Sequence, residues 1–262
     1  MPPHHTDDTD WLARLPSDVL QCIFRLMSQE DALRCVLSKY LTPSKHGDGA
    51  AFLTSLNIHK KLNPGCSQVG DIIERYPNTR SLAMRLTMPT SCYNTSMYSG
   101  LKTIYEKIMR LQYLKDLELD IPLVPSVSTT ILRALQTNKT LTALTLSKSI
   151  SEYDFVDLGK ALKDNRSLKV LALGCAPKKT IERFKLGDKG ATILCDALRE
   201  NKMANVQELS LQNNNIGPVG AIAIAKLCSV SSLTQLNLSH NQICGVNYYD
   251  QGTYAAEGII AI

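Results

Sequence analysis

Leucines recur along most of the chain at fixed intervals and alternate with polar residues. The pattern L-x-x-L-x-L-x-x-N starts at Val206 in VQELSLQNNNIG and again at Leu233 in LTQLNLSHNQI. Three earlier copies start at Leu114, Leu141 and Leu168, with the same spacing from one start to the next. Self-similarity at a constant period of about 27 residues predicts a repeat protein.

The order of residues within each unit predicts a strand followed by a helix. The L-x-L pair alternates between two faces, as a strand requires. Apolar residues at helical spacing follow it in DLGKALKDN, GATILCDALREN and GAIAIAKLC, so Ala161 with Leu162, and Ala191 with Leu194 and Leu198, should face the strands. Two weaker copies lie upstream, in LTSLNI and TRSLAM. We predict about seven repeats over residues 50–262, the first two degenerate and the last incomplete.

This unit resembles the leucine-rich repeat of the ribonuclease-inhibitor type. The resemblance implies an α/β horseshoe solenoid, with a parallel sheet on the inside and helices on the outside. Coils of such a solenoid stack because a single repeat cannot bury its own apolar face. The usual role of such a horseshoe is to bind another protein.

In two of the repeats, an asparagine stands at the turn that follows the strand. We assign Asn215 in NNNIG and Asn241 in SHNQI to this position. A side-chain amide there can bond the free backbone groups of neighbouring coils. The predicted role of both residues is therefore structural.

The outward strand positions define the predicted binding face. They are mostly small and polar. Their charges do not share one sign that would indicate the class of the ligand. We take the following residues as candidates for partner contact: Lys115, Glu118, Asp120, Thr145, Ser147, Ala172, Ser210, Gln212, Asn237 and Ser239.

Two insertions interrupt the period. The step from Leu168 to Val206 is longer than the others, with the surplus around APKKTIERFK, and CGVNYYDQGTYAAE follows Asn241 before GIIAI restarts a helix. Insertions at fixed points of a repeat become loops on one rim, often the binding rim. Tyr248, Tyr249 and Tyr254 are candidate anchors for a partner, because amphipathic aromatic side chains suit interfaces. Alternatively, they pack the loop onto the rim.

Composition narrows the possible partners and compartments. The chain has 262 residues, a net charge of +5 with dispersed cations, four Phe and one Trp, which gives little support to nucleic-acid binding. The start MPPHHTDDTDW has no signal-peptide character, and no apolar run is long enough to span a membrane. Eight cysteines without a C-x-x-C pair favour a reducing compartment. We expect a cytoplasmic or nuclear protein that has no cofactor and binds neither membrane nor nucleic acid.

Residues 11–45 do not carry the repeat and predict a small helical module. An amphipathic helix begins after Pro16 and carries Leu20, Ile23, Phe24 and Met27 on one face. Asp31 is a candidate N-cap for a second helix. One interpretation is a cap that shields the first repeat, as every solenoid needs.

The order of residues in this module supports a second interpretation. Leu15-Pro16, Asp18-Val19-Leu20, Ile23-Phe24 and Met27 resemble the F-box, a motif that docks on the Skp-type adaptor of cullin–RING ubiquitin ligases. The second half departs from the family pattern, since Ala32 precedes Leu33. The resemblance implies an adaptor-facing surface formed by Leu15, Pro16, Leu20, Ile23 and Met27.

No catalytic constellation is present in the sequence. Nucleotide-binding, zinc-protease and nucleophile-elbow motifs are absent. His240 and Cys244 are close in sequence, but His240 falls in a repeat turn where an exposed polar residue is expected. Asp188 and Asp196, near Lys189 and Arg199, are interpreted as helix-surface charges.

The predicted function is the substrate receptor of a cullin–RING ubiquitin ligase, without catalytic activity of its own. The module would bind the adaptor and the repeats would hold an unknown target protein. One alternative is a repeat-only interaction scaffold, or an effector that mimics F-box proteins. Another is a horseshoe resembling the GTPase-activating protein of the Ran system, in which the N-terminal helices act only as a cap.

Overall fold

The computed structural model describes most of the repeat region. The residues described are 55–61, 67–87, 95–120, 125–147, 152–174, 185–202, 204–246 and 251–262. The predicted helical module, with Leu15, Pro16, Leu20, Ile23 and Met27, lies outside these residues, as do Tyr248 and Tyr249.

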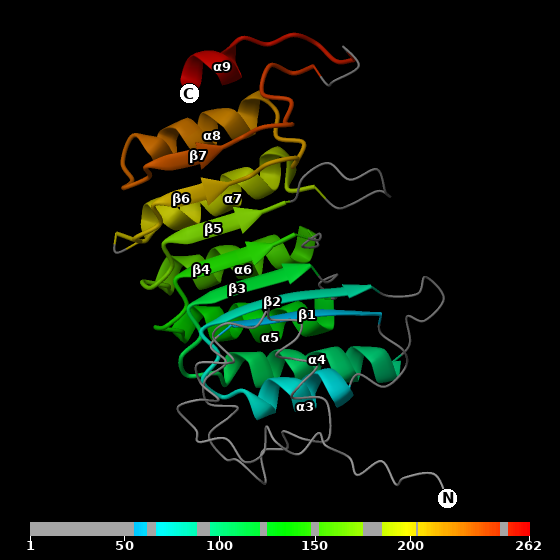
Figure 1. The fold of residues 1–262 in the computed structure, drawn as a ribbon. Coiled ribbons are helices and arrows are strands. Elements are labelled where there is room, and N and C mark those ends of the chain that lie inside the picture. Colours follow the sequence, from blue (N-terminus) through cyan, green and yellow to red (C-terminus); the bar gives the residue numbers. More distant parts are fainter. Residues whose placement is uncertain are drawn as a thin grey trace, which may run out of the picture.

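Seven parallel strands form one sheet, and their order in space is their order in the sequence. The strands are β1 (Ser55–Lys61), β2 (Ser81–Thr87), β3 (Asp116–Asp120), β4 (Ala143–Leu146), β5 (Val170–Leu173), β6 (Glu208–Ser210) and β7 (Gln235–Asn237). Each strand pairs with the next one along the chain, so each coil contacts only the coils before and after it (Figure 1). This is the topology predicted from the constant period of the leucines.

Helices connect the strands and cover one face of the sheet (Figure 1). They are α3 (Ser67–Arg75), α4 (Thr95–Met109), α5 (Pro125–Thr137), α6 (Glu152–Asp164), α7 (Gly187–Glu200), α8 (Pro218–Cys228) and α9 (Glu257–Ala261). The two upstream coils predicted as degenerate have the longest strands of the described sheet, seven residues each. Helix α9 confirms that GIIAI restarts a helix after the second insertion.

The core lies between the sheet and the helices and is built from columns of apolar side chains. Leu82, Leu117, Leu144, Leu171 and Leu209 occupy equivalent register positions on neighbouring strands, and each is at most 2% exposed. Stacking of equal side chains continues the core from coil to coil, and each buried leucine contributes about 1.5–3 kcal/mol. On the helix side of this core, the five residues predicted to face the strands are buried: Ala161, Leu162, Ala191, Leu194 and Leu198.

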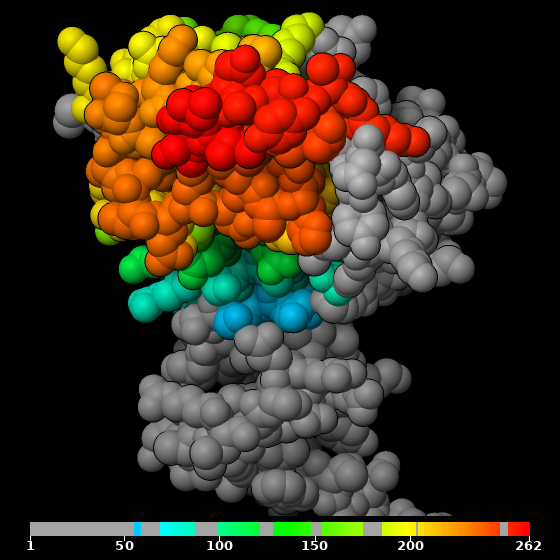
Figure 2. Space-filling view, turned by 90° about the horizontal axis from the view of Figure 1, so that it is seen from above, coloured from blue at the N-terminus to red at the C-terminus, as the bar shows by residue number. Residues whose placement is uncertain are grey.

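The last coil is less well covered than the others. Leu236 and Leu238 continue the core columns but are only half-buried. Figure 2, which looks down on this end, shows residues 251–262 lying over the last strand and helix of the stack. Ile259 and Ile260 of α9 remain 54% and 80% exposed, so this short helix covers the end only in part.

Asp188 differs from its predicted role as a helix-surface charge. Its Oδ1 accepts hydrogen bonds from the backbone N–H groups of Gly217 at 2.6 Å and Gly220 at 2.9 Å, at the start of α8. A carboxylate at a helix N-terminus satisfies free donors and complements the helix dipole. The carboxylate therefore joins α7 to α8. Asp196 is a surface charge as predicted and pairs with Arg199 at 3.0 Å.

Candidate functional site

The face of the sheet opposite the helices is open along the described strands. Side chains at alternate positions of each strand point away from the core, and none of those whose burial is described is buried. The parallel register aligns these positions into continuous rows. The middle row runs through Asn57, Ala83, Glu118, Thr145, Ala172, Ser210 and Asn237.

The character of this face changes along the solenoid. Its centre, over β4 to β6, carries small or polar groups such as Thr145, Ala172 and Ser210. At β2 and β3 it carries charge, because Arg85 Nε donates to Asp120 Oδ2 at 2.6 Å and Glu118 is exposed. The surface therefore offers a central area of mostly small side chains, with one carboxylate at Glu208, beside a more highly charged area.

The structure places most of the predicted contact residues on this face. Six of them stand at outward strand positions: Glu118, Asp120, Thr145, Ala172, Ser210 and Asn237. Three more, Ser147, Gln212 and Ser239, lie just after their strands, two residues beyond the middle row, and continue the outward alternation. Lys115 is an exception. It precedes β3 by one residue and breaks the outward alternation of Asp116, Glu118 and Asp120, so it belongs to the edge of the sheet.

Tyr254 is the one candidate anchor of the second insertion that lies among the described residues. It is 67% exposed. The turn before it is held by hydrogen bonds from Gly245 N to Gln242 O and from Ala255 N to Cys244 O.

The predicted turn asparagine of the sixth coil is wrong by one residue. Asn214, not Asn215, is buried, and its Nδ2 donates to Leu173 O at 2.7 Å in the preceding coil. Asn241 has the same role in the next coil, donating to Leu211 O at 2.8 Å and accepting from Asn214 N at 3.0 Å. Asn215 is exposed at φ +57°, a left-handed conformation that asparagine tolerates. The repeat pattern counted from Val206 ends at Asn214, so the prediction of Asn215 was a miscount within three consecutive asparagines.

A second asparagine ladder, absent from the sequence prediction, runs along the opposite edge of the solenoid. Asn165 Nδ2 donates to Leu135 O at 2.7 Å and to Asn138 O at 3.3 Å in the preceding coil. Asn201 Nδ2 donates to Leu162 O at 2.7 Å and to Asn165 O at 2.6 Å. The signal was present as N-x-[ST]-L at Asn138 and again at Asn165, one repeat later. Read by itself, such a triplet resembles a glycosylation sequon.

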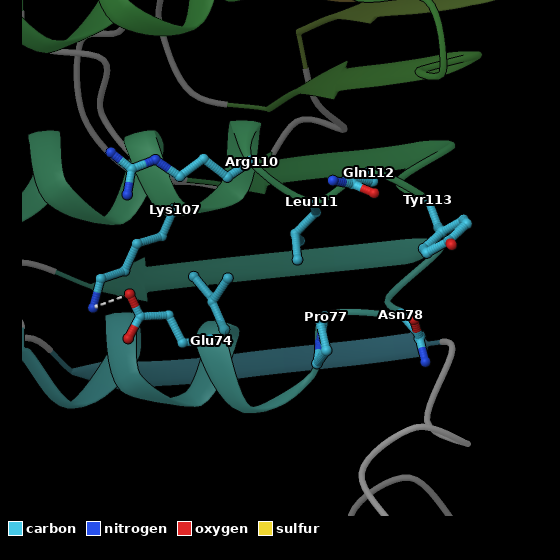
Figure 3. A pocket seen from close by; sticks show the side chains of 9 residues that line it. Glu74, Pro77, Asn78, Lys107, Arg110, Leu111, Gln112 and Tyr113 are labelled. Atoms are coloured by element: carbon cyan, nitrogen blue, oxygen red, sulfur yellow. Dashed lines mark ion pairs between the residues drawn. The ribbon is translucent and has the colours of Figure 1, made fainter. Parts of the chain in front are cut away.

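Two surface pockets lie on this same edge, where helices end and strands begin. The first, of about 400 Å³, lies between the ends of α3 and α4 and is shown in Figure 3. Pro77 and Leu111 supply its apolar side, and Lys107 forms an ion pair with Glu74 at 3.2 Å across it. The second, of about 470 Å³, lies between the ends of α7 and α8.

The described residues do not assemble a metal or nucleophile site. Among them, no group of three His, Cys, Asp or Glu side chains is arranged to hold a metal ion. Burial raises the pKa of the Cys195 thiol to about 12, with smaller contributions from Cys228 and Asp196. His240 is exposed in its turn, as predicted. No described helix is long and apolar enough to cross a membrane.

A family model supports the repeat assignment. The model described as "Leucine Rich repeat" matches residues 202–225 and 231–244, which cover β6, α8 and β7. Within these residues the solenoid therefore matches the leucine-rich repeat. No F-box model matches, and a search of curated proteins found no match.

Three solved structures are similar to parts of this chain. Leiomodin-1 Actin-Binding Site 2 is 17% identical, covering 63% of this chain and 86% of that chain, with a TM-score of 0.41. A tropomodulin C-terminal domain of Caenorhabditis elegans is 15% identical, with coverages of 67% and 93% and a TM-score of 0.38. A Listeria monocytogenes internalin is 15% identical, with coverages of 77% and 72% and a TM-score of 0.23.

Proposed function

We propose that this protein is a non-catalytic interaction scaffold that binds a partner protein on the open face of its sheet. The supporting observation is the register of the strands, which aligns unburied outward side chains into rows across seven strands. Rows of this kind form a surface that a folded partner can contact at many points. The small residues at Thr145, Ala172 and Ser210 let a partner backbone approach closely, while Glu118 and the Arg85–Asp120 pair provide polar contacts.

Site-specific crosslinking tests this proposal. A photo-crosslinking amino acid placed at Thr145 on the sheet is expected to capture a discrete partner protein, whereas the same group at Arg133 on the exposed side of α5 is expected to capture none. The substitution Ala172→Arg should abolish capture at Thr145, because it places a long charged side chain beside Thr145 in the middle row. Equal capture from both positions, or capture unaffected by Ala172→Arg, would refute the sheet face as the binding surface.

A second candidate function rests on residues 11–41. Their resemblance to the F-box supports a role as substrate receptor of a cullin–RING ubiquitin ligase, which holds its target on the repeats. Catalytic benefit would then come from proximity, since tethering raises the effective concentration of the target near the ligase. In this role the protein works in the cytoplasm or the nucleus, where its cysteines stay reduced.

Binding of the intact chain to a purified Skp-type adaptor tests this second function. Leu15→Ala combined with Pro16→Ala is expected to abolish binding, because both residues belong to the adaptor-facing surface that the resemblance implies. A matched control, Gln29→Ala with Glu30→Ala, changes polar residues of the same segment and is expected to retain binding. Absence of adaptor binding by the unaltered chain would leave the scaffold function alone.

A further inference from the structure

The edge where helices end and strands begin carries a row of cations that the asparagine ladder holds in place. Asn138, Asn165 and Asn201 are each followed directly by a cation, namely Lys139, Arg166 and Lys202. Because Asn165 bonds to Asn138 O and Asn201 bonds to Asn165 O, the three loops are locked to one another. The cations therefore lie on consecutive coils along one line. This edge is on the left in Figure 1, at the tails of the strand arrows.

A second row of cations runs beside the first, immediately before the strands. Arg80, Lys115 and Lys169 occupy equivalent positions there, joined through backbone bonds from Lys115 N to Arg80 O, Thr142 N to Lys115 O and Lys169 N to Thr142 O. Neighbouring parallel strands are about 4.8 Å apart, so Lys115 and Lys169 project from backbones about 10 Å apart. All six cations of the two rows are exposed.

These cations lack carboxylate partners among the described residues. None of the six forms an ion pair within that part of the chain. Of the acidic groups at the nearby helix ends, Glu200 pairs with Lys163 at 2.6 Å, and Asp164 accepts a hydrogen bond from the neutral amide of Gln136 at 2.5 Å. The edge therefore presents an excess of positive charge, with its cations repeated from coil to coil.

The larger pocket lies at the end of this row and combines apolar walls with a cationic rim. Leu198, Val206 and Leu227 form apolar walls, and Lys202 belongs to both the pocket and the cation row. Val230 lines the pocket and is 68% exposed, although it occupies the position, three residues before the first leucine of its repeat, at which earlier coils have Asn138 and Asn165. The Ser231 hydroxyl, also in the lining, is buried without a hydrogen-bond partner.

We propose that this basic edge docks an acidic segment of a partner protein and that one apolar side chain of that segment enters the pocket between α7 and α8. Carboxylates along the segment complement Lys139, Arg166 and Lys202, and the pocket walls bury the apolar side chain. A nucleic acid would satisfy the charges but has no aliphatic side chain of the size of leucine for the pocket. The edge is distinct from the open face of the sheet, so it can act whether or not that face binds.

Fluorescence anisotropy with synthetic peptides tests the role of charge in this proposal. The probe is a labelled ten-residue peptide of Glu and Asp with one central Leu, added to the full chain. Replacing Lys139, Arg166 and Lys202 by Ser is expected to weaken binding by about tenfold at low salt. The matched control replaces Lys102, Arg133 and Lys160, exposed cations on helices α4 to α6, by Ser and should change affinity by less than about twofold at the same net charge.

The role of the pocket is tested by the ratio of two affinities. The Leu peptide is expected to bind about tenfold more tightly than the same peptide with Ser in place of Leu, in line with burial of one aliphatic side chain. Val230→Asn, which restores the residue used by earlier coils, should reduce this preference while leaving the Ser peptide unaffected. Ala172→Arg on the sheet face should change neither affinity, which separates this result from the proposed scaffold function.

Four outcomes would overturn the proposal. They are no binding of the Leu peptide, equal weakening by both triple variants, binding of a ten-nucleotide oligothymidine as tight as that of the Leu peptide, and loss of thermal stability in the edge variant without loss of binding. The last would mean that the cations serve only to balance the helix dipoles, whose negative ends lie at this edge.

Discussion

At the residue scale, Cys195 shows how repeat position determines chemistry. It stands on α7 among apolar neighbours, is fully buried and is one of three free cysteines in the described residues. Burial raises the pKa of its thiol from the ordinary value near 9 to about 12. A thiol that stays protonated at neutral pH is a small apolar group and a poor nucleophile.

This pKa shift predicts a loss of stability at alkaline pH. Below pH 9 the thiol is protonated in both states, so the free energy of unfolding is unaffected by this group. As pH rises from about 9 to 12, the unfolded state ionises first, and the folded state loses up to about 4 kcal/mol. Denaturant unfolding under reducing conditions measures this decline.

Cys195→Ala is the control for the alkaline prediction. It should lower stability at all pH values by removing packed volume, but it should flatten the decline above pH 9. Burial also raises the pKa of Tyr76 to about 12, so a shallower loss is expected to persist in the variant above pH 10. An unchanged slope between pH 9 and 10 would show that Cys195 does not cause it.

At the element scale, asparagine side chains add to the backbone bonds that join the loops of consecutive coils. The two asparagine ladders bond carbonyls that no strand or helix uses, one ladder on each edge of the sheet. Buried backbone acceptors without partners are costly, so each ladder residue stabilises its own turn and the coil before it. The Asp188 carboxylate does the same for the start of α8.

The neighbouring asparagines of the sixth coil allow a paired test of the ladder. Asn214→Ala removes a buried amide that bonds Leu173 O and Gln212 O, and it should lower the free energy of unfolding by about 3 kcal/mol. Asn215→Gly keeps the left-handed backbone and removes an exposed amide whose oxygen accepts from Gln242 Nε2, a solvent-exposed hydrogen bond, so it should cost less than about 1 kcal/mol. Chemical denaturation of both variants measures the difference, and equal losses would contradict the ladder assignment.

At the scale of the whole molecule, stability is a sum of coils and of the interfaces between neighbours. Central coils bury their leucines completely, whereas Leu236 and Leu238 of the last coil stay half-buried, and the helix that follows this coil has only five residues. Because the described strands pair only with their neighbours in sequence, the less covered end can open without the rest.

Alanine substitutions at two equivalent leucines, one in a central coil and one in the last coil, measure this difference in stability. Leu171→Ala in β5 should cost about 3–4 kcal/mol, since it creates a cavity enclosed by two neighbouring coils. Leu236→Ala, at the same register position in β7, should cost less than about 2 kcal/mol because its site is already partly open. Amide exchange should likewise be faster over residues 233–262 than over 141–173, and uniform exchange would show that the solenoid unfolds as one unit.

The sequence by itself determined the repeat, its strand–helix order and the face on which Thr145, Ser210 and Asn237 lie. These follow from local periodicity, because a two-residue alternation can bury only one side of a strand and a repeated unit must stack on its copies. It also located the turn asparagine at Asn241, where a single asparagine stands after the strand.

Features that depend on neighbouring coils became visible in the folded solenoid alone. The fold shows what the amide of Asn214 does, because its acceptor, the carbonyl of Leu173, lies one coil away. It turned Asp188 from a surface charge into a cap, because the donors it serves are 29 and 32 residues distant in the chain. It also aligned Lys139, Arg166 and Lys202 on one edge. Stacking of the coils places these residues side by side, although they are not evenly spaced in the sequence.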